Sequence, residues 1–490
     1  MPSIIIKEAN KTLGSNELGV TDIVYIPGLR CEPFSTSSES DESTDNYEYY
    51  TAADGTTKIY YADEIPKFTP TLCTNPAIFK RYFGNKPCTI QVGDDQSKTI
   101  QDKSYIYALE LLSLGLPVLY EALNDRVKKP DTPATPATAA EGGDGETTTT
   151  PGTTENTTHD AVVNINAVYN LMLTGTTDGK GSECIYTKLA DKGEYDFKYI
   201  TSGGYANYGY SYISKGNKSV SDDKVLSTNM ATLASTRQDC IALIDHTDNE
   251  DMVLSGTGSM IDAVQKMDNE YAAIFTPWIN IDSTVPNVGT TSMPPSFAYL
   301  TALAKSLKTN VNWLAIAGAT RGQIPNINAK RPLNINKVLT NSIAEKDYQS
   351  RGLPTEKSVS INAITNIKPF GYRIWGNRTL KNNTNTNGLT ATSFLNTRNM
   401  ISDIKKLAYR TCKRFMFEQN NDTLWLNFKS AIEPTLDKMK LGAGLSGYKI
   451  IQEPTSEKGK LKATIKLIPL YAVEDFEITV AIEDDTVSVS

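Results

Sequence analysis

The sequence predicts a mixed α/β protein, and three observations support that prediction. Apolar runs that end at a polar residue alternate with helix-like stretches between residues 229 and 380. Residues 396–467 contain two long amphipathic helix patterns followed by two strand patterns. Residues 1–125 contain several short strand-prone segments bounded by turn residues. Alternating strands and helices are typical of an open α/β sheet, whereas helices followed by strands indicate an α+β region.

The charge balance and the hydropathy exclude two broad classes of protein. The chain of 490 residues has 49 Lys and Arg against 56 Asp and Glu, a net charge of −7. Such a mildly acidic surface disfavours a protein whose main task is to coat nucleic acid. The longest apolar run, Leu111–Tyr120, contains Pro117 and is far shorter than the ~20 residues that span a bilayer. Because no signal-peptide pattern opens the chain, we expect a soluble protein made in a cytoplasm.

Histidine and cysteine usage disfavours most hydrolase and zinc-site chemistry. The chain has only two histidines, His159 and His246, although histidine is the usual general base and metal ligand near neutral pH. The six cysteines form no C-x-x-C pair and no zinc-finger spacing, which favours buried thiols over disulfides or metal ligands. These cysteines are Cys31, Cys73, Cys88, Cys184, Cys240 and Cys412. The sequence therefore predicts neither a cofactor nor a metal site.

The N-terminal part divides into an arm, residues 1–20, and a β-rich region, residues 21–125. Ser3–Lys7 is a short strand-prone segment, and the residues that follow it are polar. Thr21–Ile26 is a second predicted strand, which ends at a Pro-Gly turn signal. Ser104–Leu123 combines a helix-like half with an apolar, strand-like half.

Residues 126–228 are predicted to form an insertion on the outer surface. Residues 130–158 contain no large apolar side chain, so burial cannot offset the entropy of ordering them, and we expect a solvated, flexible loop. A tyrosine-rich strip follows at Tyr205, Tyr208, Tyr210 and Tyr212. Two interpretations remain open for this strip: a half-exposed strand with one tyrosine face, or a patch that contacts sugar or protein.

Residues 229–380 are predicted to form an α/β domain. Cys240–Asp245 is a continuous apolar run ended by a carboxylate, which is typical of a parallel strand buried on both faces. Ala272–Thr276 and Val311–Ala317 are interpreted as two further buried strands. The remaining predicted elements are the helices Asn229–Gln238, Ser259–Asn269 and Ser296–Leu307 and the strands Ile361–Ile364, Pro369–Trp375 and Arg378–Leu380.

Residues 381–472 are predicted to form a C-terminal α+β domain. Asn396–Phe417 and Thr423–Lys440 have the apolar spacing of amphipathic helices, and Pro434 predicts a bend in the second. Two strands, Tyr448–Glu453 and Lys460–Leu467, follow. Basic side chains surround the apolar stripe of the first helix and are expected on its surface: Lys405, Lys406, Arg410, Lys413 and Arg414.

The C-terminal arm, residues 473–490, alternates like a strand and carries acidic but no basic residues. Both chain ends are therefore strand-forming and lie outside any compact unit. An unpaired terminal strand promotes aggregation unless another sheet receives it. We therefore predict β-augmentation between copies of the chain, that is, a homo-oligomer joined by exchanged strands. The residues expected to pack in these arms are Ile4, Ile5, Ile6, Phe476, Ile478, Val480 and Ile482.

A set of ordered motifs resembles the contractile tail sheath proteins of bacteriophages. GYRIWGNRTL, Gly371–Leu380, resembles the family's G-x-x-x-W-G-x-R-T-L motif. Its matching positions are Gly371, Trp375, Gly376, Arg378 and Thr379. The other matching segments are TPWIN at 276–280, MPPSFAYLTAL at 293–303, NINKVL at 334–339, RNMISDIKKLAYRTCKRFMFEQNNDTLW at 398–425 and LGAGLSGYKI at 441–450. The resemblance covers residues 229–490 well and the first 125 residues loosely.

The resemblance implies a fold and a role. It implies a subtilisin-like α/β domain, here residues 229–380, and a variable outer domain at 126–228. It implies a sheath of stacked hexameric rings in helical array around an inner tail tube, which contracts to drive the tube through the host cell envelope. The implied partners are the tube protein, the baseplate and the tail terminator, without direct nucleic-acid contact or membrane insertion. The implied location is the tail of a virion assembled in the host cytoplasm.

An enzymatic interpretation has weak support in the sequence. A serine-hydrolase site would need His246, Asp245 or Asp248, and a serine such as Ser259, but the G-x-S-x-G elbow is missing. Because Asp245 and His246 are adjacent on a predicted strand, their side chains should point apart. The acidic cluster Asp245, Asp248, Glu250 and Asp251 lacks EF-hand spacing. Solvated loop acids and a structural protein that is not an enzyme are favoured.

Two other functions and one interface hypothesis complete the predictions. The Thr-, Asn- and Tyr-rich middle would also suit a surface adhesin or receptor-binding protein. A sheath of a phage-derived particle, such as a pyocin-like or other contractile injection system, is a nearer alternative. We further hypothesise that the basic surface of the 396–417 helix meets acidic residues of a neighbouring copy, with the 474–485 arm as its candidate partner.

Overall fold

The structure is a computed structural model of the whole chain. It describes residues 22–30, 35–38, 49–51, 57–60, 67–91, 99–124, 163–174, 184–205, 221–245, 268–327, 361–381, 390–457 and 459–473. Both predicted terminal arms, the 130–158 segment, the NINKVL motif and three tyrosines of the strip, Tyr208, Tyr210 and Tyr212, lie outside these residues.

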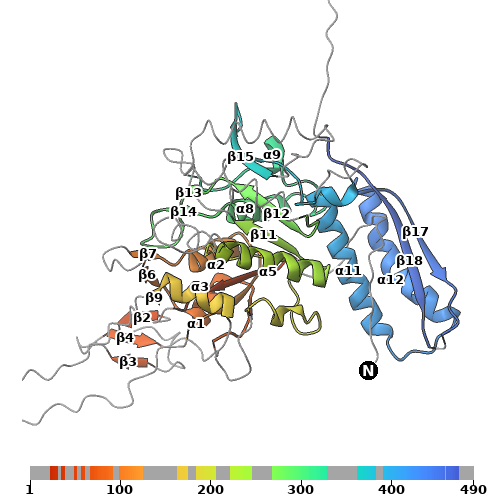
Figure 1. The fold of residues 1–490 in the computed structure, drawn as a ribbon, viewed down its shortest axis with the longest axis horizontal. Helices are drawn as coiled ribbons and strands as arrows, with labels where there is room; N and C mark the ends of the chain where they lie inside the picture. The colour runs from red at the N-terminus through yellow and green to blue at the C-terminus, as the bar shows by residue number, and fades with distance from the viewer. Residues whose placement is uncertain are drawn as a thin grey trace, which may run out of the picture.

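The centre of the molecule is an eight-stranded mixed sheet (Figure 1). Its order is β16-β15-β12-β11-β10-β1-β8-β5. The six inner strands run parallel, and β16 and β5 are antiparallel to their neighbours at the two edges. The strands are β1 (Val24–Gly28), β5 (Thr71–Cys73), β8 (Val118–Ala122), β10 (Tyr199–Ile200), β11 (Ile241–Asp245), β12 (Ala272–Thr276), β15 (Ile361–Ile367) and β16 (Gly371–Trp375). The predicted mixed α/β fold class is confirmed.

Helices cover both faces of this sheet. Alternate residues of a strand enter different apolar clusters: Tyr25 of β1 belongs to one, Val24 and Ile26 to the other. The first cluster takes in α3 (Ile165–Thr174) and α5 (Ser221–Arg237). The second takes in α1 (Pro76–Phe83), α2 (Lys103–Ser113) and α8 (Pro295–Leu307). Continuous burial of both faces explains why β11 and β12 read as unbroken apolar runs.

The central sheet contains strands from both sides of the domain boundaries predicted at residues 125 and 228. Strands β1, β5 and β8 come from the N-terminal region, and β10 comes from the predicted outer insertion. Tyr205, the first residue of the tyrosine-rich strip, is buried, and its hydroxyl donates to Asp102 Oδ1 at 2.8 Å. Parallel strands need long crossover connections, so strands distant in sequence can be neighbours in such a sheet.

Two other local predictions differ from the structure. The apolar run Val311–Ala317 forms turns and bends instead of a strand. Trp313 packs in the C-terminal cluster and its Nε1 donates to the Gly442 carbonyl at 2.8 Å, whereas Ile316 packs under the central sheet. A segment that connects two apolar clusters can be as apolar as a buried strand, so the spacing of apolar residues could not distinguish the two. The helix predicted from Asn229 begins eight residues earlier, at Ser221.

Smaller elements surround the sheet. Two three-stranded sheets lie on the left of the molecule in Figure 1, and a hairpin lies near α8. The remaining described elements are β2 (Ser35–Ser38), β3 (Tyr49–Thr51), β4 (Thr57–Tyr60), β6 (Thr89–Gln91), β7 (Thr99–Gln101), β9 (Val163–Asn164), β13 (Ile279–Asp282), β14 (Thr290–Met293), α9 (Gly318–Arg321) and the 3₁₀ turns η2 (Lys188–Ala190) and η3 (Ala391–Ser393).

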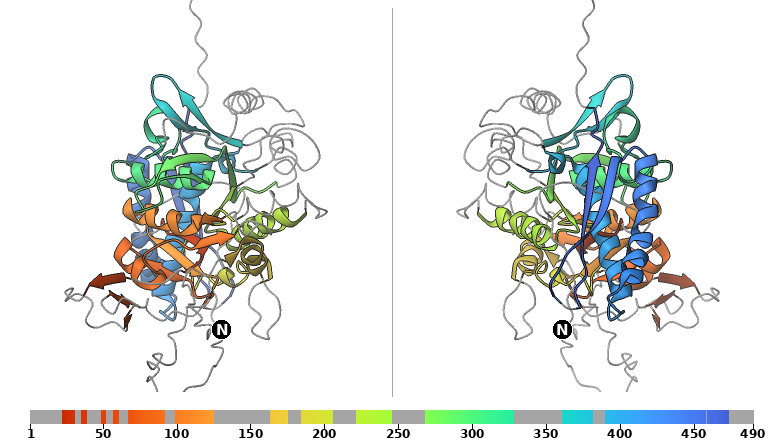
Figure 2. Two further views of the ribbon diagram at one scale, coloured as in Figure 1. Left: turned by 90° about the vertical axis from the view of Figure 1, so that its left-hand side faces the viewer. Right: turned by 90° about the vertical axis from the view of Figure 1, so that its right-hand side faces the viewer.

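The C-terminal unit lies on one side of the sheet and contains the predicted helix–helix–strand–strand series (Figures 1 and 2). It consists of α11 (Leu395–Phe415), α12 (Asp422–Leu441), β17 (Leu445–Glu453) and β18 (Lys462–Pro469). An apolar cluster joins all four, with Leu407, Ile432 and Leu467 among its members. Pro434 lies inside α12, and the bend expected there stays a prediction.

Two findings bear on the predictions from composition. Among the described residues, no helix is long and apolar enough to cross a membrane.

Cys73, Cys184, Cys240 and Cys412 are free thiols, but Cys88 is disulfide-bonded, which corrects the prediction of buried thiols throughout. Sequence spacing could not reveal that bond, since disulfide pairing depends on proximity in the fold.

Candidate functional site

The matched motif lies where the central sheet meets the start of α11. Gly371 opens β16 with a φ of 79°, a left-handed conformation that favours glycine. Gly376 lies so close to β15 that a Cβ there would be 2.7 Å from Asn362 Oδ1. Trp375, half-buried, pairs with Ala363 in the β15–β16 ladder. The glycines of the motif thus permit a tight turn and a close strand contact.

The last motif residues are buried and link β15 to the segment before α11. Asn362 Nδ2 donates to the carbonyls of Ile274 and Arg378, at 3.0 and 2.9 Å, and the Arg378 N–H donates back to Asn362 Oδ1 at 2.8 Å. The Arg378 guanidinium lies 4.7 Å from the centroid of the Phe394 ring. Thr379 Oγ1 donates to the Thr392 carbonyl at 2.8 Å. These side chains therefore position α11 against the sheet.

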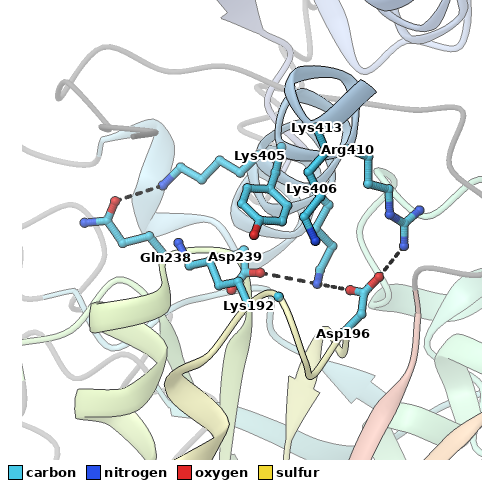
Figure 3. A pocket seen from close by; sticks show the side chains of 10 residues that line it. Lys192, Asp196, Gln238, Asp239, Lys405, Lys406, Arg410 and Lys413 are labelled. Atoms are coloured by element: carbon cyan, nitrogen blue, oxygen red, sulfur yellow. Dashed lines mark hydrogen bonds and ion pairs between the residues drawn. The ribbon is translucent and has the colours of Figure 1, made fainter. Parts of the chain in front are cut away.

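Two members of the predicted basic surface on α11 are not on the surface. Lys405 and Lys406 are only 8% and 4% exposed. Lys406 Nζ lies 2.6 Å from Asp196 Oδ1 and 3.4 Å from Asp239 Oδ2, and Arg410 also pairs with Asp196 (Figure 3). The expectation of surface positions is wrong for both lysines, because the acids that receive α11 lie far away in the sequence. Lys413 and Arg414 are exposed, as predicted.

Opposing charges keep these acids ionised. Burial alone would raise the pKa of Asp196, but Lys406 and Arg410 outweigh it and leave the pKa below its usual range. Burial alone would also raise the pKa of Asp239, but Lys406 and Arg237 lower it below its usual range. A cation shared between two carboxylates favours their charged forms.

A fully buried ion pair fixes the middle of α11. Lys198 Nζ lies 2.8 Å from Asp22 Oδ1 and 2.8 Å from Asp403 Oδ1, and Asn312 Nδ2 donates to Asp403 Oδ2 at 2.8 Å. Burial would lower the pKa of Lys198, but the two carboxylates raise it above its usual value. Burial raises the pKa of Asp403 to about 6, and the negative charge of Asp22 adds to the rise, whereas Lys198 opposes it.

The first turns of α11 are attached in the same way. Arg398 Nη2 lies 2.9 Å from Glu270 Oε1, and its guanidinium is 4.2 Å from the Tyr271 ring centroid. Asn399 Nδ2 donates to Tyr299 Oη at 3.0 Å. The sequence did not point to Arg398 and Asn399, because they belong neither to the apolar stripe of the helix nor to its predicted basic surface. The acid Asp403, within an otherwise basic helix, was the one available signal.

The strands β17 and β18 form a two-stranded antiparallel sheet of their own. One face packs on α12 through Ile450 and Ile465, and the other points outward (Figure 2, right). Neither outer edge pairs with any other strand among the residues that the structure describes. Backbone N–H and C=O groups on such edges are available to a further strand. Apolar side chains just after β18 are exposed, with Tyr471 at 56% and Val473 at 69%.

The one described member of the enzymatic alternatives has a structural role. The buried Asp245 carboxylate accepts from the Ser296 N–H at 2.8 Å and from Ser296 Oγ at 2.7 Å, which holds the first turn of α8. The other residues of that alternative, His246, Asp248, Glu250, Asp251 and Ser259, lie outside the described residues. Within the described part of the chain, no group of three or more His, Cys, Asp or Glu could hold a metal ion.

Asp245 predicts a specific dependence of stability on pH. Burial raises its pKa from 3.8 to about 6, although Ser296 and Ser202 oppose the shift. The folded chain therefore binds a proton that the unfolded chain has released, and the resulting stabilisation, present below pH 4, is lost as the pH rises through 6. We expect Asp245→Asn to match the parent at pH 4 and to exceed it at pH 7 by up to about 3 kcal/mol.

Urea unfolding between pH 4 and pH 7.5 measures this difference. The exposed acid Glu457 provides a control: Glu457→Gln should leave the parent curve unchanged. Parallel pH curves for the parent and Asp245→Asn would contradict the prediction.

Comparisons with known proteins extend this description. No protein-family model and no curated protein sequence matches the chain. A solved chain of the anti-feeding prophage (AFP) baseplate in the contracted state aligns over 99% of both chains, with a TM-score of 0.55 and 16% identity. A chain of the six-fold symmetrised AFP baseplate also aligns over 99% of both, with a TM-score of 0.51 and 11% identity. A chain of the PVC sheath complex, from an extracellular contractile injection system in its contracted state, covers 99% of this chain and 98% of its own, with a TM-score of 0.48 and 13% identity. Along its whole length, then, this chain shares its fold with chains of the AFP baseplate structures.

Proposed function

We propose that this chain is a sheath subunit of a contractile tail or contractile injection system and has a structural, non-enzymatic role. The main support is the β17–β18 sheet, whose two outer edges pair with no described strand. The ordered motifs between residues 276 and 450 and the fold shared with the AFP baseplate chains agree with this role. Copies join when the terminal arms of neighbouring subunits add strands to those edges.

The C-terminal arm complements the outward face of this sheet in charge. Lys449 and Lys466 lie directly opposite each other in the ladder, and both are exposed. Like charges at directly opposed positions are unfavourable. An arm paired with either edge would bring acidic side chains such as Glu477 beside these lysines, while Phe476 and Ile478 extend the apolar face over α12. Lys413 and Arg414, exposed at the end of α11, remain the candidate basic contacts with a neighbour.

The attachment of α11 suits a subunit that moves as one body. The buried ion pairs Lys198–Asp403 and Arg398–Glu270 hold the C-terminal unit to the central sheet. When a sheath contracts, subunits rotate and slide while strand tethers maintain the connections between them. Contacts that are head-to-tail and do not close propagate into helical or stacked-ring polymers. The work then comes from the free energy of the assembled lattice and needs no nucleotide.

The proposed partners follow from this role. They are further copies of the chain in stacked hexameric rings, an inner tube protein, a baseplate and a tail terminator. The proposed location is the tail of a virion or of a phage-derived particle, assembled in the host cytoplasm. Because the chain shares its fold with AFP chains, the proposal includes two kinds of sheath: that of a tailed phage and that of an injection particle.

Deletion of residues 473–490 tests the proposal. We expect the full chain to form striated tubes in negative-stain electron microscopy and the deleted chain to stay folded and monomeric by circular dichroism and sedimentation velocity. A matched control lacks residues 130–158, which contain no large apolar side chain, and should still form tubes. Tubes formed by the 473–490 deletion would refute strand exchange through this arm. If the full chain forms no tubes but binds cells, the adhesin alternative replaces the proposal.

A further inference from the structure

A basic pocket lies at the joint between α11 and the central body (Figure 3). Its volume is about 160 Å³, and it is partly open to solvent. Three segments form its wall: residues 192–196, the pair Gln238 and Asp239 before β11, and residues 405–413 of α11. Because about 10–15 Å³ of such space holds one water molecule, the pocket has room for a small polyatomic ion.

Positive charge exceeds negative charge around this pocket. Five basic side chains line it, against the two carboxylates of Asp196 and Asp239. Both carboxylates are already engaged: Lys406 and Arg410 bind Asp196, and Lys406 and Arg237 bind Asp239. The five basic residues are Lys192, Lys405, Lys406, Arg410 and Lys413.

Two of the basic residues face neutral groups. Lys405 Nζ lies 3.4 Å from Gln238 Oε1 and 3.2 Å from Tyr271 Oη. Lys413 Nζ lies 5.1 Å from the ring centroid of Tyr409. Lys192 and Lys413 form no ion pair with any residue that the structure describes. Burial, together with the charges of Arg237 and Lys405, lowers the pKa of Lys192, against the pull of Asp239. The basic side chains of the pocket wall therefore lie in a region of net positive charge.

We propose that this pocket is a binding site for a small, multiply charged oxyanion of the phosphate class, which would bridge the body and α11. A single carboxylate would neutralise only one of the surplus charges, whereas a phosphate or pyrophosphate group carries several and offers oxygens in several directions. Lysine is a point-charge donor with three N–H groups, which suits such an anion. Because Lys192 belongs to the body and Lys413 to α11, the anion stabilises the joint between them. This inference concerns a single subunit; it shares Lys413 with the assembly proposal but does not depend on that proposal.

Isothermal titration of the full chain with inorganic pyrophosphate at fixed ionic strength tests the site. We expect saturable one-to-one binding with a Kd on the order of 100 µM. Lys192→Ala and Lys413→Ala should each weaken binding about tenfold, since each removes one charge from the pocket. Lys440→Ala, which removes an exposed lysine of α12 away from the pocket lining, should leave the Kd within about twofold.

Two further ligands identify the class of anion and its source. If ATP binds as tightly as pyrophosphate, the result supports the site and indicates a nucleotide phosphate. If pyrophosphate binds and ATP does not, the result supports the site and indicates an inorganic ion. Citrate that binds as tightly as pyrophosphate would overturn the assignment to phosphate. Absence of saturable binding, or equal weakening by Lys440→Ala, would overturn the site itself. Tube formation is read separately by electron microscopy, so a failed titration leaves the assembly proposal unaffected.

Discussion

Replacing Lys198 with methionine is expected to lower the free energy of unfolding by about 4 kcal/mol, because removal of one partner from a buried ion pair leaves its counter-charge buried and uncompensated. Lys198 is fully buried between Asp22 and Asp403, at 2.8 Å from each. Methionine fills similar volume but neutralises neither acid. The urea midpoint of the full-length chain, followed by circular dichroism, measures the loss.

An exposed lysine provides the matched control for this substitution. Lys429 pairs with Glu433 one turn along α12, at 3.6 Å, and both side chains are more than a third exposed. Exposed pairs of this spacing contribute about 0.3–0.5 kcal/mol, so Lys429→Met should barely move the midpoint. Adding Asp403→Asn to Lys198→Met should recover part of the loss, since it removes one of the stranded charges. Equal, small losses for Lys198→Met and Lys429→Met would contradict this account of α11.

The parts of the fold predicted from sequence are those whose pattern is local. Cys240–Asp245 and Ala272–Thr276 were recognisable as buried strands because both of their faces are covered by helices. The C-terminal helices and strands were recognisable because each has one apolar face. The order of the central sheet could not be predicted, since it joins β1 and β10 across more than 170 residues of chain. No local pattern marks such a crossover.

The site shows the same division between local and distant information. The strand-forming character of β17 and β18 follows from their alternation, but only the folded chain shows that their outer edges pair with no described strand. The positive character of α11 was predicted, yet burial of Lys405 and Lys406 depends on Asp196, Asp239 and Tyr271, which come from other elements. A helix that is basic in sequence can therefore use its charges inside the subunit and leave few of them for a neighbour.

Gly376→Ala is expected to destabilise the chain by about 3 kcal/mol, because an added methyl group has no space and would disturb a hydrogen-bonded asparagine. A Cβ at Gly376 would lie 2.8 Å from the Cα of Asn362, so backbone rather than a flexible side-chain end must move. The side chain of Asn362 holds both Ile274 of β12 and the backbone of Arg378. Displacing it loosens the connection from the central sheet to α11.

A second glycine separates this effect from the general cost of changing glycine to alanine. Gly447 lies in β17, and the nearest atom to a Cβ there is 4.0 Å away, so Gly447→Ala should change the unfolding free energy by about 0.5 kcal/mol or less. Thermal and urea unfolding of the two variants measure the difference. If Gly376→Ala unfolds like Gly447→Ala, the strands β15 and β16 are not packed as closely as Asn362 requires. If Gly376→Ala is destabilised as expected, the glycine of the matched motif is needed for packing within the subunit. Any loss of assembly by soluble Gly376→Ala protein should then follow from the weaker attachment of α11 to the central sheet.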